Sequence, residues 1–295
     1  MHVFYRPEQT AAIRNSAGSP SAGKPALAVA DWLRRGLVSP EQVHSFEPVG
    51  VDDLKRVHDA DFVDGVLSLE LDNGFGNREA DVARSLPYTS GSMLAAAEFA
   101  IGHREHVCSP TSGFHHAGHS MAGGYCTFNG LIVTAMKLKA QGLVERVGII
   151  DLDMHYGDGT QELIRHHRLD WIHHHTQGRH FHEREDIGRQ GHRYLSWLDK
   201  ALADCQGVDL LLYQAGADPH VRDPLGGLLT GQLMSLRDHA VFEAFAGRPL
   251  VWNLAGGYQV DIHGRIDPVL RLHRNTVVAC QTVARQTAAE QNKED

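Results

Sequence analysis

Three short, mainly apolar runs set the strongest limit on how this chain can fold. They span Val147 to Leu152, Val208 to Tyr213 and Pro249 to Leu254, and each is followed by a loop and then a helical pattern. Such runs are typical of strands in parallel sheets buried on both faces, because an exposed face would favour alternating polar residues. They predict an α/β fold with a mostly parallel sheet covered by helices on both sides.

Weaker patterns extend this alternation over the rest of the chain. Further strands are predicted at His2 to Tyr5, Val43 to Phe46 and Glu105 to Cys108. Helices are predicted at Pro25 to Leu37, Val51 to Glu70, Gly130 to Gln141, Thr160 to His167, Thr230 to Phe245 and Ile266 to Val283. No repeat or linker divides the chain, which predicts a single domain over residues 1–295.

Three segments are predicted to lie outside the regular structure. Arg14 to Lys24 is rich in Ser, Gly and Pro, and Asn73 to Pro87 is polar with two glycines, so both are expected to be surface loops. The polar tail after Arg285 is expected to fray.

Composition narrows the classes of function. The chain is 42% hydrophobic and 22% charged, which allows a folded core, and its net charge of −8 argues against a nucleic-acid partner. No apolar run of about 18 residues predicts a membrane span. Four scattered cysteines without a CxxC pair suit reduced thiols, so a soluble cytoplasmic protein is expected. The oligomeric state stays open, and a homo-oligomer is compatible with these features.

The polar residues at the strand ends indicate a metal centre. Asp151, Asp153 and His155 follow one another at the end of the first apolar run, and Asp218 follows the next strong strand after two small residues and a glycine. Taken singly, each Asp is better explained as a helix cap or a turn. Together, carboxylate oxygen and imidazole nitrogen suit a divalent ion such as Zn²⁺ with an open coordination position.

Further candidate residues precede and follow this set. His115 and His116 come after the strand predicted at Glu105 to Cys108, although neighbouring histidines occur elsewhere in a chain with 21 of them. Paired glycines lie before Tyr125 and before Tyr258, where they allow the backbone to approach a ligand closely.

Five segments in this order, GFHHA, GGYCTFNG, DLDMHYGDG, AGADP and AGGY, resemble the family of histone deacetylases and acetylpolyamine amidohydrolases, in its bacterial form. The resemblance is strong from about residue 100 to 260. It implies an arginase-like three-layer α/β/α sandwich and a zinc-dependent deacylase. The implied substrate is an acyl-lysine, an acylated polyamine or a related N-acyl amine.

The resemblance also implies roles for individual residues. Zn²⁺ would be bound by Asp153, His155 and Asp218, and it lowers the pKa of a bound water from 15.7 to about 7. The implied catalytic residues are the tandem His115 and His116, their respective carboxylate partners Asp151 and Asp158, and Tyr258 as the donor to the oxyanion. The implied substrate-binding residues are Gly124 and Tyr125 in the acyl tunnel, Phe181 as its facing wall, and Cys126 near its foot.

The sequence departs from the family pattern in places. The usual Pro-Pro-Gly before the tandem histidines is replaced by a segment ending in Gly113 and Phe114, which could reshape an internal pocket. A Ser-Leu-His that helps to bind a structural K⁺ is matched by the stretch from His173 to His175, so K⁺ is expected with less support than zinc. The rim aspartate that grips substrate has only Glu79 and Asp81 as nearby candidates.

Two other functions compete with the deacylase. A catalytically silent metal- or acyl-binding protein could share the fold, but every polar catalytic position is filled here. A binuclear-manganese ureohydrolase of the related arginase fold would need a second set of Asp and His ligands, and the sequence around His115 and His116 does not provide one.

Overall fold

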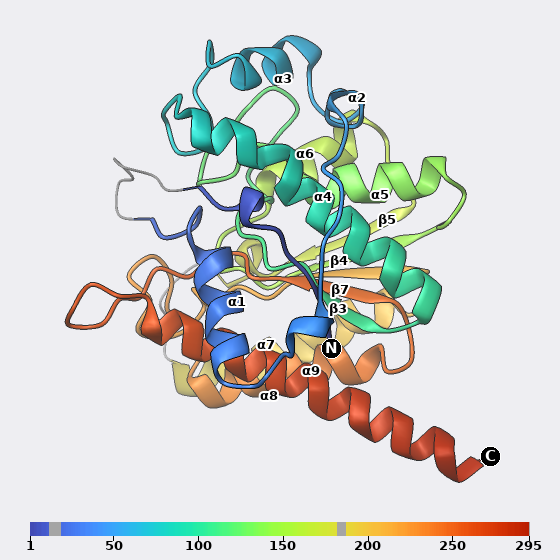
Figure 1. Ribbon diagram of the computed structural model, residues 1–295. Coiled ribbons are helices and arrows are strands. Elements are labelled where there is room, and N and C mark those ends of the chain that lie inside the picture. Colours follow the sequence, from blue (N-terminus) through green and yellow to red (C-terminus); the bar gives the residue numbers. More distant parts are fainter. Residues whose placement is uncertain (12–18, 182–186, 295) are drawn as a thin grey trace.

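The structure is a computed structural model that describes residues 1–11, 19–181 and 187–294. In these residues seven strands form one sheet in the order β2-β1-β3-β7-β6-β4-β5, and every strand pair is parallel (Figure 1). The strands are β1 (His2–Phe4), β2 (Val43–His44), β3 (His106–Cys108), β4 (Val147–Asp151), β5 (Ile172–Thr176), β6 (Leu210–Gln214) and β7 (Leu250–Asn253). The predicted parallel sheet is confirmed.

Helices cover both faces of the sheet (Figure 1). On one face pack α1 (Lys24–Arg34), α7 (Ile187–Asp204), α8 (Gly231–Ala244) and α9 (Asp267–Glu294). On the other pack α2 (Val51–Lys55), α3 (Ala60–Leu67), α4 (Ala80–His103), α5 (Gly130–Ala140) and α6 (Asp158–His166). Three 3-10 helices, η1 (Pro7–Gln9), η2 (Pro40–Gln42) and η3 (Gln177–Arg179), lie in the connections. This is the three-layer α/β/α sandwich that the family resemblance implies.

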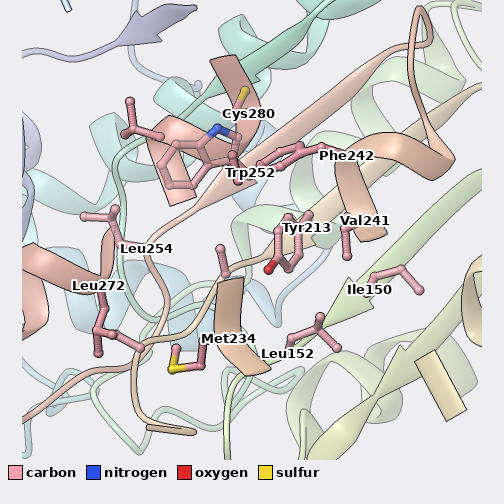
Figure 2. Packing of buried hydrophobic residues seen from close by; sticks show 14 of the residues in the cluster. Ile150, Leu152, Tyr213, Met234, Val241, Phe242, Trp252, Leu254, Leu272 and Cys280 are labelled. Carbon is pink, nitrogen blue, oxygen red and sulfur yellow. The ribbon is translucent and has the colours of Figure 1, made fainter. Parts of the chain in front are cut away.

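The apolar runs supply both layers because neighbouring residues of a strand point to opposite faces. In β4, Ile149 packs under α4 and α5, whereas Ile150 packs toward α7 and α8. Figure 2 shows the second layer, in which Tyr213, Phe242 and Trp252 lie together. Burying each such aromatic side chain contributes about 1.5–3 kcal/mol.

The three segments predicted to be irregular differ from expectation. α4 begins at Ala80 and contains Pro87, because its apolar side chains pack into the core and outweigh the local preference of proline. Of the first predicted surface loop, residues 12–18 lie outside the described chain, and Ser19 and Ser21 are buried. α9 runs on to Glu294 instead of fraying after Arg285, since its Gln, Ala and Glu residues favour helix, and its end projects from the body (Figure 1).

The helices and the cysteines bear on the expected absence of a membrane span and of disulfides. Within the described residues, no helix combines the length and apolarity that crossing a bilayer requires. Each of the four cysteines is a buried, free thiol.

The sheet order brings the candidate residues to one edge. β3, β7, β6 and β4 are neighbours, so their carboxyl ends point into the same region. Asp151 of β4 is in register with Gln214 of β6, which is in register with Asn253 of β7. The loops that follow these strands therefore meet there, as expected for a ligand site in a parallel sheet.

Candidate active site

Asp153, His155 and Asp218 form a compact group of possible metal ligands, with one ligand atom of each within 4.8 Å of the others. The Nδ1 atom of His155 lies 3.1 Å from Oδ1 of Asp153 and 3.1 Å from Oδ2 of Asp218. Donors at roughly 2.0–2.1 Å from a tetrahedral zinc ion are spaced roughly 3.3 Å apart. The separations of this group are therefore close to those of a zinc site.

The electrostatics of this group also favour a cation. Both carboxylates are buried, and their hydrogen bonds and charges raise the pKa of His155 to about 11. Burial beside Asp153 raises the pKa of Asp218 to about 7. Oδ2 of Asp218 is buried without a well-aligned hydrogen-bond donor. Two buried carboxylates with too few donors need a positive charge between them, which a divalent ion supplies.

Gly256 completes the cradle around these ligands. Its backbone N–H donates to Oδ2 of Asp153 at 2.7 Å. A Cβ at this position would lie 2.3 Å from Oδ2 of Asp218 and 2.6 Å from Oδ2 of Asp153. The first glycine of the GG pair thus keeps the space between the carboxylates free, which explains why a glycine is found here after β7.

His115 is the inner of the tandem histidines and is fully buried against β4. Its Nδ1 atom donates to Oδ2 of Asp151 at 2.8 Å, and its Nε2 atom lies 3.7 Å from Oδ1 of Asp153. Burial alone would lower the pKa of His115, but the charges of Asp151 and Asp153 outweigh it and raise the pKa to about 9. The surrounding carboxylates therefore favour the protonated form of His115.

A chain of buried amides holds Asp151 in place. Asn253 donates to Oε1 of Gln214 at 3.2 Å, and Gln214 donates to Oδ1 of Asp151 at 3.1 Å. All three side chains are buried in the sheet. Gln214 and Asn253 were not among the predicted site residues, although a single amide at the end of an apolar strand is a signal that could have indicated them.

His116 is the outer histidine and pairs with the first residue of α6. Its Nδ1 atom donates to Oδ1 of Asp158 at 2.7 Å, which leaves Nε2 with a lone pair. Burial and the neighbouring charge of His115 lower the pKa of His116, so the ring is neutral near pH 7. A neutral imidazole fixed by a carboxylate is suited to accept a proton.

Tyr258 follows the GG pair and lies near enough to Asp153 and Asp218 for their charges to act on its hydroxyl. Burial and the charges of Asp153 and Asp218 raise the pKa of its hydroxyl, which therefore stays protonated. The backbone N–H groups of Tyr258 and Gln259 donate to Oδ2 of Asp223 at 2.7 and 3.2 Å. Asp223, which sequence reasoning missed, thus fixes the turn that carries the phenol.

Two buried cations that sequence reasoning also missed support the loops. Arg237 of α8 donates to the carbonyl oxygens of Leu152 at 3.2 Å and Gly216 at 2.8 Å, so it ties the β4 and β6 loops together. Lys24 of α1 donates to the carbonyl of Ala255, and burial lowers the pKa of its ammonium to about 8. From the sequence, both residues look like exposed charges on helix surfaces, and no local pattern indicates that they are buried.

The predicted substrate residues are only partly brought together. Gly124 lies against the ring of His116, and Tyr125 packs between Phe75 and Tyr258 at ring distances of 5.5 and 5.7 Å. Tyr125 adopts a positive φ of 64°, an unusual conformation for a side chain of this size. The thiol of Cys126 is buried beside this loop, and burial raises its pKa, so it is not a nucleophile at neutral pH.

Phe181 is placed differently from the expected tunnel wall. It is only 3% exposed and packs against Tyr194 and Trp197 of α7, with ring distances of 5.3 and 5.7 Å. An open cleft of about 790 Å³ lies at the carboxyl ends of the strands and is bordered by His116 and His155. Gly178, in the segment after β5, lines this cleft, whereas Phe181 does not. The cleft is lined by His116, Met154, His155, Tyr156, Asp158, Gly178, Pro224, Leu225 and Gly226.

The departures from the family pattern also have defined positions. Phe114 is buried in the core, where its ring fills the space that a side chain at Gly130 would need. His173 and His175 of β5 both point to Asp204, at 3.1 and 2.9 Å, and so turn away from the metal group. Of the rim candidates, Asp81 pairs with Arg84 on the exposed side of α4.

Comparison with known proteins gives a consistent result. The model of the histone deacetylase domain matches residues 22–269. An uncharacterised protein of Picosynechococcus is 30% identical over 263 residues, covering 82% of this chain and 87% of the relative. Acetoin utilization protein AcuC of Staphylococcus aureus is 28% identical over 232 residues, and the match spans 65% of this chain but only 59% of AcuC.

Acetylpolyamine amidohydrolase of Mycoplana ramosa is 36% identical over 91 residues, which are 30% of this chain and 25% of that enzyme. Among solved structures, the HD domain of HDA15 aligns with a TM-score of 0.74 and 20% identity over 96% of this chain and 88% of its own. Acetylpolyamine aminohydrolase of Burkholderia pseudomallei aligns with a TM-score of 0.70 and 16% identity over 96% and 99%. At these identities the structural likeness establishes the fold.

Proposed function

Because the chain belongs to the histone deacetylase family, we propose that it is a zinc-dependent deacylase that hydrolyses the amide bond of N-acylated amines. The main support is that the His116–Asp158 pair lies beside the group formed by Asp153, His155 and Asp218, with the ring centroids of His116 and His155 6.0 Å apart. A proton acceptor and a cation site therefore share one edge of the sheet. Family membership supports hydrolysis of acetylated amides, and the geometry supports assigning its steps to particular side chains.

Asp153, His155 and Asp218 would hold the zinc ion, because they offer the oxygen and nitrogen donors, the spacing and the unbalanced negative charge that such an ion requires. When bound, the ion would supply a Lewis acid that polarises the substrate carbonyl and makes a water molecule more acidic. K⁺ stays a prediction, since His173 and His175 point to Asp204 and the hydroxyl of the family pattern is missing.

The side chains around the ion would have different roles in the reaction. His116 accepts the proton of the attacking water at Nε2 while Asp158 holds its Nδ1 proton, and it then donates to the leaving amine. His115, held as a cation by Asp151, contributes positive charge next to the reacting carbonyl. Tyr258 donates its hydroxyl proton in a hydrogen bond to the carbonyl oxygen as negative charge develops there.

The proposed substrates are small acylated amines, such as acetylated polyamines, and acyl-lysine side chains. The likeness to acetylpolyamine amidohydrolase of Mycoplana ramosa supports the first group. The net charge of −8 also supports the first group, because an acetylated polyamine keeps a cationic amine that a negative protein attracts. Gly124 and Tyr125 would border the acyl group, and Cys126 would pack behind them as a thiol without a chemical role.

Turnover of substrates compared side by side tests this proposal. Acetylputrescine, an acetyl-lysine peptide and longer acyl-lysines are incubated with zinc-loaded protein, and the released amine is measured. Release of amine by the wild type and its loss in Tyr258→Phe, with zinc retained, is the expected result. No release from any substrate at full zinc occupancy would instead favour a silent binding protein. Urea release from a guanidino substrate would favour the ureohydrolase.

A further inference from the structure

A second group of metal-ligating side chains lies outside the candidate active site. His119, His166 and His167, termed here the histidine cluster, bring one ring nitrogen each within 4.8 Å of one another. The rings are close, with centroids of His119 and His166 3.8 Å apart and those of His166 and His167 4.7 Å apart. His166 is exposed and the other two are half-buried.

The backbone carbonyl of Val57 orients two of the three rings. Its oxygen lies 3.1 Å from Nδ1 of His119 and 2.7 Å from Nε2 of His167. A carbonyl only accepts hydrogen bonds, so both of these nitrogens carry the proton. In each neutral ring the other nitrogen, Nε2 of His119 or Nδ1 of His167, then has a lone pair available. Fixing the tautomer through a backbone carbonyl is how proteins prepare histidine as a metal ligand.

The backbone around the cluster is also fixed. The N–H of His119 donates to Oε2 of Glu162 at 2.7 Å, and its carbonyl accepts from the N–H of Asp59 at 2.8 Å. Glu162 and His166 are four residues apart on α6 and so share one face of the helix. A carboxylate therefore stands beside the three imidazoles and would balance part of the charge of a bound cation.

We propose that the histidine cluster binds one transition-metal ion of the zinc class, separate from the ion held by Asp153, His155 and Asp218. Imidazole nitrogen suits Zn²⁺, Ni²⁺ and Cu²⁺, whereas Mg²⁺ and Ca²⁺ prefer oxygen ligands. Three histidines provide three of the four positions of a tetrahedral site, and water would complete it. The rings of His119 and His166 are stacked at an interplanar angle of 22°, so the exposed His166 ring must rotate out of this stack to direct a nitrogen at the ion.

The histidine cluster joins two segments that also carry the His116–Asp158 pair. His119 lies three residues after His116, and α6 runs from Asp158, the partner of His116, to His166. An ion at the cluster would therefore join the far ends of the two segments that carry the His116–Asp158 pair. This second metal site goes beyond the proposed deacylase activity and does not depend on it, because metal binding can be measured without substrate turnover.

Zinc stoichiometry tests the site. Metal-free protein is dialysed against micromolar Zn²⁺, and zinc per chain is measured by elemental analysis for the wild type, His166→Ala and His119→Ala. His263→Ala removes another exposed histidine and is the matched control. Asp218→Asn removes a ligand of the other group. We expect both cluster variants to hold one zinc ion fewer than the wild type and the control, and Asp218→Asn to retain the cluster ion.

A second measurement covers variants that fold poorly. In the Asp218→Asn background, excess Zn²⁺ should raise the Tm, adding His166→Ala should abolish that increase, and Mg²⁺ should have no effect. His166 is exposed, so its replacement leaves the packing of α6 intact. Equal zinc content in the wild type and His166→Ala, or a zinc-induced Tm increase that survives this change, would overturn the proposal.

Discussion

Gly124 lies so close to the imidazole of His116 that a Cβ at this position would be 2.4 Å from Cδ2 of the ring. Its φ of 53° is also in the left-handed region, which side chains rarely adopt. The glycine therefore defines where His116 can sit, and through it the hydrogen bond to Asp158. This contact links the glycine-rich loop to the proton acceptor of the proposed mechanism.

The first prediction concerns this contact. Gly124→Ala should displace the His116 ring and lower kcat about 10²-fold, because a misplacement of about 1 Å is sufficient for such a loss. Zinc content should not change. Gly123→Ala is the matched control, since its added methyl group meets no atom within 4 Å. Unchanged kcat in a folded Gly124→Ala protein would show that the ring position is not limiting.

The second prediction separates the tandem histidines. His116→Ala should lose roughly 10²–10⁴ in kcat/KM, the usual contribution of general acid–base catalysis, and more than His115→Ala. Tyr258→Phe should be impaired to a similar degree while it still binds zinc and a hydroxamate. Kinetics at verified metal content decide the matter. Near-native activity in His116→Ala would rule out its role as proton acceptor.

The third prediction concerns the metal ligands. Changing Asp153, His155 or Asp218 to Ala should each remove bound zinc from that site. Gly256→Ala should do so without altering any ligand, because its Cβ would occupy space within 2.6 Å of both carboxylates. Gly102→Ala, where the added methyl group meets nothing within 4 Å, is the control. Elemental analysis in a His166→Ala background isolates this site, and full occupancy in Asp218→Ala would refute the ligand assignment.

The sequence could predict the centre of the site because parallel strands bring their carboxyl ends to one edge. Asp153 and Asp218 lie 65 positions apart in the numbering, and the strand pattern places both at the carboxyl end of the sheet, where the observed order of β6 next to β4 brings them together. The pairs His115–Asp151 and His116–Asp158 required the family resemblance as well. No periodic pattern indicates which carboxylate faces which ring.

The supporting residues could not be predicted for physical reasons. Arg237 and Lys24 are charged residues on helices, and only the packed fold shows that they are buried with backbone carbonyls as partners. Phe181 was expected at a tunnel wall, but an aromatic residue at a loop end packs equally well in a core, as it does against Tyr194. Local propensity likewise failed at Pro87, where burial of neighbouring α4 side chains decides the outcome.

The fourth prediction concerns Arg237, which is fully buried and bonded to Asp238 at 2.8 Å as well as to the two loop carbonyls. Arg237→Met should lower the free energy of unfolding by about 3–5 kcal/mol, because it leaves a buried carboxylate without its cation. Zinc affinity should fall as the Leu152 and Gly216 carbonyls lose their donor. Arg78→Met, which breaks an exposed ion pair with Asp72, should have little effect on denaturant unfolding. Equal stability of the two variants would contradict this role.

The fifth prediction concerns the pH dependence of stability and rests on His106, far from both proposed metal sites. His106 is 7% exposed at the start of β3, and its Nε2 atom donates to the carbonyl of Phe245 at 2.8 Å. Burial lowers the pKa of its imidazole below the usual 6.5. The folded protein therefore keeps this ring neutral at a pH where the unfolded chain binds a proton.

The sign follows from proton binding, because the state that binds more protons is favoured as the pH falls. His106 should therefore make no pH-dependent contribution above pH 7 and should destabilise the fold as the pH falls from about 6.5 toward its lowered pKa, by at most about 1.4 kcal/mol per pH unit. His106→Gln keeps a donor for Phe245 but cannot titrate. Denaturant unfolding should show a constant difference between wild type and variant from about pH 7 to 8 and a shrinking one below about pH 6.5. A difference that stays constant down to pH 5 would show that burial of His106 is not coupled to acid unfolding.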